Sequence, residues 1–186
     1  MSTNVGFLKG HISSHEPFVL SSGATALVPK YEPTFKKWGG PLLNNTFGGK
    51  AVLDVSGSPA FAELAIAELF RRAGFSARWA ETYGRGSRLP KFMLSWNDTS
   101  YGEQDDCPIG ECWVMDALRR IAELNGGSYS GCWDVIAWKG DRLVFAESKR
   151  SKKDRIRDSQ RHWLEAGLKS GLAPGNFLVV EWDTIN

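Results

Sequence analysis

Two short apolar runs separated by a tight turn form the clearest pattern in the chain. Residues 134–138 and 143–147 are hydrophobic except at their outer ends, and Gly140-Asp141 lies between them. A glycine-first pair suits a two-residue β-hairpin loop. With that loop, the runs pair so that Asp134 lies directly opposite Glu147, where facing side chains have Cβ atoms about 4.5–5.5 Å apart. Because the runs are almost wholly apolar, we expect the hairpin to be buried on both faces.

Helical and strand-like periodicity continues on both sides of this hairpin. Ser58 and Pro59 have the chemistry of a helix N-cap and first turn, so a helix is predicted to begin there and to end near Gly74. Two more helices are predicted at residues 111–124 and 154–168, and three strands at residues 75–82, 91–96 and 177–182. This order predicts an α/β (α+β) fold with a mixed central sheet flanked by helices.

The chain divides by composition near residue 57. Residues 1–57 are rich in Gly, Ser, Pro and Asn, so we expect an irregular N-terminal extension with one or two short strands, such as residues 51–55. Residues 58–186 carry the periodic elements and form the expected domain. Within it, residues 97–110 are polar and acidic, which is typical of a surface loop.

Composition narrows the class of protein. The 186 residues are 42% hydrophobic and 24% charged, as in an ordinary globular domain. Three cysteines at irregular spacing indicate a reducing compartment, and Cys107 and Cys112 are too isolated for a zinc site. No apolar run approaches the ~18 residues of a membrane span, and residues 1–10 lack the layout of a signal peptide. We therefore expect a cytoplasmic protein without membrane contact.

Positive charge is concentrated just after the hairpin. The whole chain has a net charge of +2, but residues 149–162 hold seven Lys and Arg against two Asp, so this segment is +5 and the rest is −3. Such a patch predicts a phosphate-bearing partner, although a solvated helix face would have the same composition. The candidate contacts are Arg150, Lys152, Lys153 and Arg155, together with Arg85 and Arg88 in a glycine-rich loop.

The facing acids at the end of the hairpin are the strongest indication of chemistry. Two opposed carboxylates repel, and a hard divalent cation such as Mg²⁺ binds carboxylate oxygens. Lys149 lies two residues beyond Glu147 and projects from the same face. Its ammonium group could hold a water, help to deprotonate it or stabilise a developing negative charge. The simpler alternative is a solvated hairpin end with one ion pair, but the apolar surroundings favour a metal site.

These residues resemble the motif of the PD-(D/E)xK nuclease superfamily. Asp134 is followed, at the end of an apolar strand, by Glu147-Ser148-Lys149. Gln160, followed by x-x-Trp-Leu about a dozen residues past that motif, is similar to the VRR-NUC branch, and Glu63 on the first predicted helix matches an early-helix acid. The resemblance covers residues 58–182. It departs from the family at the tryptophan before Asp134, where the family often has proline, and at residues 97–110, which resemble an insertion.

The resemblance implies a restriction-endonuclease-like fold and a metal-dependent phosphodiesterase that acts on DNA. Asp134, Glu147 and the backbone carbonyl of Ser148 would hold Mg²⁺, for which Mn²⁺ could substitute. Glu63 is preferred over Glu68 to complete the metal shell. Lys149 and Gln160 would be the other catalytic residues: Lys149 would orient or activate the attacking water, and Gln160 would hydrogen-bond within the site.

Several functions remain open at this point. Structure-selective cleavage of branched, flap or four-way-junction DNA is the leading prediction, because no base-reading motif is visible. A junction-cleaving enzyme would be a homodimer, since two symmetric cuts need two sites. No nucleotide cofactor is expected. The alternatives are a restriction or defence nuclease, a catalytically inactive nucleic-acid-binding module of the same fold, and a protein-interaction domain.

Overall fold

A computed structural model of the chain describes residue 6 and residues 11–185. The described part is mixed α/β, 24% helix and 32% strand in total, with an eight-stranded mixed sheet and three α-helices as its main elements. The predicted fold class is therefore confirmed.

The strands are β1 Ile12–Val19, β2 Thr25–Tyr31, β3 Thr34–Lys36, β4 Leu53–Val55, β5 Ser58–Ala60, β6 Ser76–Glu81, β7 Lys91–Met93, β8 Val135–Lys139, β9 Arg142–Arg150 and β10 Phe177–Ile185. The helices are α1 Ala62–Arg72, α2 Cys112–Leu124 and α3 Asp158–Lys169, with short 3₁₀ turns at Tyr101–Glu103 and Pro174–Asn176.

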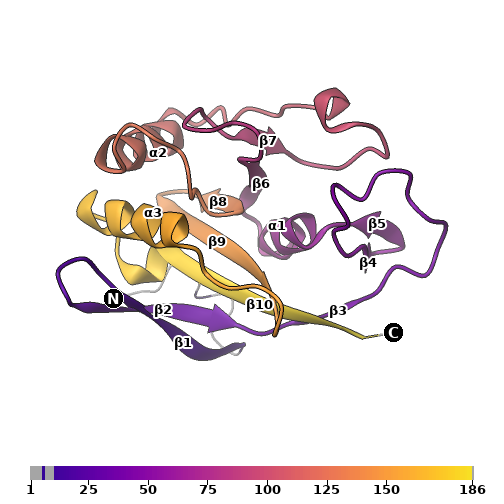
Figure 1. The fold of residues 1–186 in the computed structure, drawn as a ribbon, viewed down its shortest axis with the longest axis horizontal. Coiled ribbons are helices and arrows are strands. Elements are labelled where there is room, and N and C mark those ends of the chain that lie inside the picture. Colours follow the sequence, from indigo (N-terminus) through magenta and orange to yellow (C-terminus); the bar gives the residue numbers. More distant parts are fainter. Residues whose placement is uncertain (1–5, 7–10, 186) are drawn as a thin grey trace.

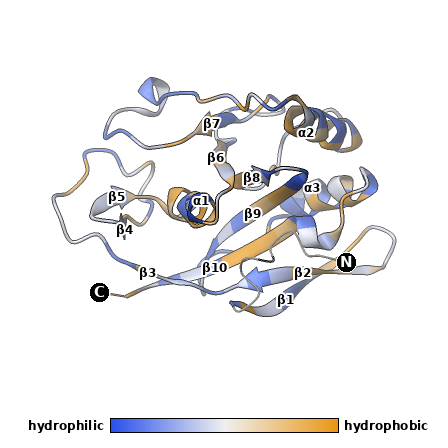
Figure 2. Ribbon diagram, turned by 180° about the vertical axis from the view of Figure 1, so that it is seen from behind, coloured by the Kyte–Doolittle hydropathy of each residue, from blue (hydrophilic) through white to orange (hydrophobic). Residues whose placement is uncertain are grey.

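The main sheet has the order β1-β2-β10-β9-β8-β6-β7, and β3 pairs with the far end of β10. The central strand β10 runs parallel to β2, β3 and β9, while the other pairs are antiparallel. Figure 2 shows the first half of β10 in the hydrophobic colour, as expected for a strand covered on both faces. Every described helix is too short or too polar to cross a bilayer.

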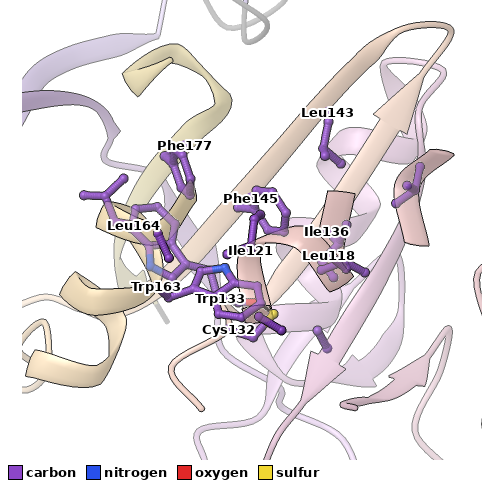
Figure 3. Close-up of a cluster of buried hydrophobic side chains, with 14 of the residues drawn as sticks. Leu118, Ile121, Cys132, Trp133, Ile136, Leu143, Phe145, Trp163, Leu164 and Phe177 are labelled. Atoms are coloured by element: carbon purple, nitrogen blue, oxygen red, sulfur yellow. Dashed lines mark hydrogen bonds between the residues drawn. The ribbon is translucent and has the colours of Figure 1, made fainter. Parts of the chain in front are cut away.

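Helices cover both faces of the sheet and define two cores (Figure 1). Helices α2 and α3 lie on one face, where Phe145, Trp133, Trp163 and Phe177 pack together (Figure 3). Helix α1 lies on the opposite face, where Ile66 and other apolar residues meet the alternate side chains of β8, β9 and β10. Side chains that alternate along β9 therefore point in turn toward α3 and toward α1.

The predicted hairpin and its register are confirmed. Strands β8 and β9 are antiparallel, with Lys139 opposite Arg142 and Val135 opposite Ala146. Asp134 directly precedes this ladder and Glu147 directly follows it on the other strand, so the two acids face each other. The two strands are buried along most of their length.

The expectation of an irregular N-terminal extension over residues 1–57 is wrong for residues 12–31 and 34–36. These form β1, β2 and β3, which belong to the main sheet, so the sheet crosses the boundary expected at residue 57. The pattern was weak because β1 is a half-exposed edge strand and β2 contains Pro29, which is disfavoured in strands. The short strand expected at residues 51–55 is observed as β4. Residues 1–5 and 7–10 of the extension lie outside the described residues.

Two predicted helix starts are also wrong. Ser58 and Pro59 lie in β5, which pairs with β4, and α1 begins only after Phe61. Helix α3 begins at Asp158 because the chain turns first, where the Arg150 N–H donates to the Asp154 carboxylate at 2.9 Å. At the first site the predicted cap residues are paired in a strand, and at the second they form a turn, so neither serves as a helix N-cap. The predicted helix at residues 111–124 and the C′ glycine of α1 agree with the structure.

Glu165 on α3 ties the β1–β2 turn to the helix. Its carboxylate accepts hydrogen bonds from the Ser21 hydroxyl and, at 3.1 Å, from the Ser21 N–H, and it pairs with Lys169 at 2.9 Å. These contacts lower the pKa of Glu165 to about 2. The stabilisation is therefore present above the usual glutamate pKa and is lost as pH falls through the lowered one.

We predict that Glu165→Gln lowers the free energy of unfolding by about 1 kcal/mol at neutral pH, allowing for solvent screening at a surface contact. The difference from wild type should shrink as pH falls from roughly 4.5 toward 2. Urea denaturation of both proteins across this range measures it, with Glu123→Gln on the exposed face of α2 as the control. A difference that stays constant with pH would contradict this account.

Candidate functional site

A pocket of about 990 Å³ opens where β6 and β9 approach the first turns of α1 and α3. Its charged lining includes Lys50, Glu63, Glu81, Asp134, Glu147, Lys149, Arg150, Lys153, Asp154, Arg155 and Arg157. Acidic groups therefore gather around the buried end of the hairpin, and the basic segment predicted after β9 borders the same space.

Asp134 and Glu147 form the acidic centre of this pocket. The backbone N–H of Ser148 donates to the Asp134 carboxylate at 2.9 Å and holds it beside β9. Glu147 is only 1% exposed. Burial raises the pKa of Glu147 well above its usual range, the neighbouring Asp134 adds to the rise, and Lys149 opposes it. The folded chain thus holds a carboxyl group whose ionisation is costly without added positive charge.

Lys149 and Gln160 complete a hydrogen-bonded triangle around Glu147. The Lys149 ammonium group lies 2.9 Å from Glu147 Oε1 and donates to Gln160 Oε1 at 3.0 Å. The Gln160 amide donates to the same Glu147 oxygen at 2.5 Å. Gln160 therefore bridges the acid and the base, and it fixes the Lys149 side chain over the pocket.

The first turn of α3, which carries Gln160, is held in place by Trp133 and by the close approach of Gly131, and a hydrogen bond within the turn adds to this. The Trp133 indole N–H donates to the Gln160 carbonyl at 3.1 Å, and the Arg157 N–H donates to the Gln160 side chain at 2.8 Å. Gly131 has a φ of +81°, and its Cα lies so close to α3 that an added Cβ would be 2.0 Å from the Ser159 carbonyl oxygen. Trp133, where the resemblance would place proline, thus anchors Gln160.

Glu63 reaches the pocket from the other face of the sheet. It lies in the first turn of α1, is 8% exposed and pairs with Lys50, whose Nζ is 2.5 Å from its Oε1. Burial raises the pKa of Glu63, Lys50 opposes the rise and Asp134 adds to it. Glu68, the alternative early-helix acid, instead pairs with Arg71 and Arg72 away from the pocket lining.

Two charged residues that act on the acidic centre, Glu81 and Lys50, had not been predicted from the sequence. Glu81, at the end of β6, is 7% exposed, and its carboxylate accepts a hydrogen bond from the Tyr83 N–H at 2.6 Å. Burial raises the pKa of Glu81, and the Tyr83 hydrogen bond opposes the rise. An acid at the end of an apolar strand could have indicated Glu81, as it did Glu147. Lys50 lies in a segment without periodicity, so no local pattern indicated it.

The predicted basic contacts divide into two groups. Arg150, Lys153 and Arg155 line the pocket, together with Arg157, whereas Lys152 lies in the turn after β9 and is not part of the lining. This places the basic segment beside the acidic centre. These basic side chains precede α3, which begins only at Asp158, so they lie at the pocket mouth and not on a face of that helix.

The loop arginines Arg85 and Arg88 fold back on their own loop. Arg85 donates to the Leu89 carbonyl at 2.9 Å, and Arg88 donates to the Arg85 and Gly84 carbonyls at 3.1 and 3.2 Å. Neither side chain is part of the pocket lining. The structure therefore does not bring them to the acidic centre.

The donor set fits one divalent cation at the hairpin end. Glu147 Oε2 is buried and accepts no hydrogen bond from an N–H or O–H group in the described part of the chain, and a charged neighbour of like sign, the Asp134 carboxylate, raises the pKa of Glu147. With the facing Asp134 carboxylate, it offers hard oxygen ligands of the kind Mg²⁺ takes. Among the described residues, however, no group of three or more His, Cys, Asp or Glu side chains lies together as a metal cluster, and Glu63 is already paired with Lys50.

Comparisons with protein-family models, with curated proteins and with solved structures returned no match. The residues of this site and their geometry alone therefore indicate its chemistry.

We predict that Gly131→Ala lowers the free energy of unfolding by more than about 2 kcal/mol, because its Cβ would meet the α3 backbone and the residue would keep a left-handed φ. The matched control is Gly127→Ala, which has a φ of +76° but nothing within 4 Å of an added Cβ. That control should lose only about 1 kcal/mol. Equal losses in urea denaturation would show that the approach to α3 is unimportant.

We predict that Asp134→Asn stabilises the protein in EDTA, because it removes one of two facing negative charges. The gain should be at most about 4 kcal/mol, as for like charges roughly 4 Å apart at an effective dielectric constant of about 20. Because the pKa of Glu147 is raised in the folded protein, the free energy of unfolding falls as pH rises above the usual glutamate pKa. The stabilisation by Asp134→Asn should therefore grow from about pH 4.5 upward and vanish below that pH. Thermal unfolding from pH 4 to 8 measures this, and a destabilised variant at pH 8 would contradict it.

Proposed function

We propose that the chain is a metal-dependent endonuclease that hydrolyses phosphodiester bonds in DNA. The observation that carries the proposal is the joint arrangement of Asp134, Glu147, Lys149 and Gln160 at the end of a buried hairpin, inside a pocket bordered by basic residues. This is the arrangement that the resemblance to PD-(D/E)xK nucleases implies.

Asp134 and Glu147 would hold Mg²⁺ or Mn²⁺, joined by the Ser148 backbone carbonyl. A bound divalent cation would polarise a phosphoryl oxygen and neutralise charge. The facing acids are suited to this task because they are fixed by β8 and β9 and by the Ser148 N–H, so little reorganisation is required on binding.

Lys149 is the residue suited to act on the attacking water. Its ammonium group is nearly buried and has fixed hydrogen bonds, so it can orient a water and offset the negative charge that develops on the phosphoryl oxygens. Gln160 sets the position of Lys149 and donates a hydrogen bond to Glu147 Oε1. The other oxygen, Glu147 Oε2, accepts no hydrogen bond in the described chain. The site thus separates a metal-binding oxygen from a lysine-binding one.

The basic border of the pocket supports a polyanionic substrate. Arg150, Lys153, Arg155 and Arg157 present cations that can contact successive phosphates. Contacts of this kind position a nucleic-acid backbone without reading its bases. This favours recognition of DNA structure, such as a branch, flap or four-way junction, over recognition of a sequence. Symmetric cutting of a four-way junction would involve a homodimer.

We predict that the protein cuts labelled duplex, flap or four-way-junction DNA with Mg²⁺ or Mn²⁺ and not with EDTA. Lys149→Ala should reduce the cleavage rate by about 10²–10³-fold, as for the loss of one charge-stabilising donor. Asp134→Asn should abolish cleavage. Gel assays with all three substrates measure these rates and rank the substrates.

Asp141→Asn is the matched control, because Asp141 is an exposed acid at the opposite end of the same hairpin. It should cut as wild type does. Cleavage that persists in EDTA would contradict a metal-dependent mechanism. Binding of DNA without cleavage under any metal would instead identify the catalytically inactive binding module, and an RNA substrate in the same assay tests the choice of nucleic acid.

A further inference from the structure

Lys50 is a charged pocket residue that neither the motif nor the proposed chemistry uses. It lies between β3 and β4, in the part of the chain expected to be irregular, yet its side chain reaches the pocket and pairs with Glu63 at 2.5 Å. Its ammonium group also lies 4.8 Å from the centre of the Trp79 ring and 5.3 Å from that of Phe47. An ion pair and two aromatic faces thus hold one cation in place.

The loop that delivers Lys50 is built for this position. Asp98 accepts hydrogen bonds from the backbone N–H groups of Asn44 and Asn45 at 2.9 and 2.8 Å, and the Asn45 amide donates to the Thr99 carbonyl at 2.7 Å. The Phe47 ring then contacts the rings of Trp79, Tyr83, Trp96 and Tyr101 at 5.3–6.0 Å. Residues 44–50 are therefore clamped to the loop that follows β7, and Lys50 is presented at the pocket wall.

Lys50 interacts with the acids of both sheet faces. Burial alone would lower the pKa of Lys50, but Glu63, and more weakly Asp134 and Glu81, raise it, and the net pKa is higher than usual. Lys50 therefore remains an ammonium cation among three acids. Without Lys50, the buried Glu63 carboxylate would lose its paired cation.

Six charged groups at and beside the hairpin end have a net negative charge, whereas Arg150, Lys153, Arg155 and Arg157 border the pocket mouth. In the described part of the chain, four carboxyl groups and two ammonium groups act on one another electrostatically: Glu63, Glu81, Asp134, Glu147, Lys50 and Lys149. When all are ionised their sum is −2, which one divalent cation neutralises. Without Lys50 the sum would be −3, and a second cation would be favoured beside Glu63.

We propose that Lys50 is a built-in cation that occupies the Glu63 side of the site, so that the chain binds one divalent metal ion, at Asp134 and Glu147, rather than two. This inference depends on the proposed metal-dependent function and refines it. Glu63 then serves as the partner of Lys50 and not as a metal ligand. Lys50 is a positioning residue: it acts on the site through Glu63, and its exposed edge faces the pocket that would receive a phosphate.

The test is to count bound Mn²⁺ per chain by equilibrium dialysis with electron paramagnetic resonance detection of the free ion. Wild type and Lys50→Arg should each bind one Mn²⁺. Lys50→Met, which keeps an apolar stem against the Trp79 and Phe47 rings, should bind two. One Mn²⁺ in Lys50→Met, or two in wild type, would overturn the inference and leave the nuclease proposal standing.

A double variant keeps the test decisive if Lys50→Met does not fold. Lys50→Met/Glu63→Gln replaces an ion pair with a neutral pair, so it should bind one Mn²⁺ with an affinity within about threefold of wild type. If Glu63 were a metal ligand, the affinity should fall by tenfold or more. A different result would overturn the proposed function itself. Wild type would then bind no Mn²⁺, and Asp134→Asn would melt at the same temperature as wild type both with and without Mn²⁺.

Discussion

The antiparallel register of β8 and β9 is the constraint on which the rest of the structure depends. A two-residue turn fixes that register, and the register forces Asp134 and Glu147 to face each other at the inner end of a buried hairpin. A shift of one residue would turn every side chain of one strand to the opposite face and separate the acids. The repulsion between them is therefore built in by the same pairing that stabilises the centre of the sheet.

The surrounding structure is arranged to tolerate this buried pair. Lys149 and Gln160 satisfy one oxygen of Glu147, and the backbone of Ser148 satisfies Asp134. Gln160 can do so only because Gly131 lets the first turn of α3 approach the chain that leads into β8. One Glu147 oxygen still accepts no hydrogen bond in the described chain. Buried acids of this kind reduce stability in the absence of a cation, which is typical of sites arranged for binding or chemistry.

The site also joins the two faces of the sheet. Strand alternation directs Glu147 and Lys149 toward α3, whereas Glu63 arrives from α1 and Lys50 from the loop clamped by Asp98. The pocket lies where these groups meet. Residues 44–50 and 97–101 lack regular periodicity, yet they bring the Lys50 side chain to the pocket because their own hydrogen bonds and aromatic contacts fix them.

The sequence by itself determined the elements that are specified by residues close together along the chain. The hairpin, its register, α2 and the position of Glu147 and Lys149 follow from periodicity and turn chemistry, which act over a few residues. The tertiary structure alone decided which distant segments complete the site and the sheet. Strand β2 is held by its pairing with β10, and β1 is held by its pairing with β2. Lys50 is brought to Glu63 because its loop contacts residues about fifty positions away along the chain. Such long-range pairing leaves no periodic trace in a half-exposed edge strand or a glycine-rich loop, because the partner rather than the segment supplies the stabilising contacts.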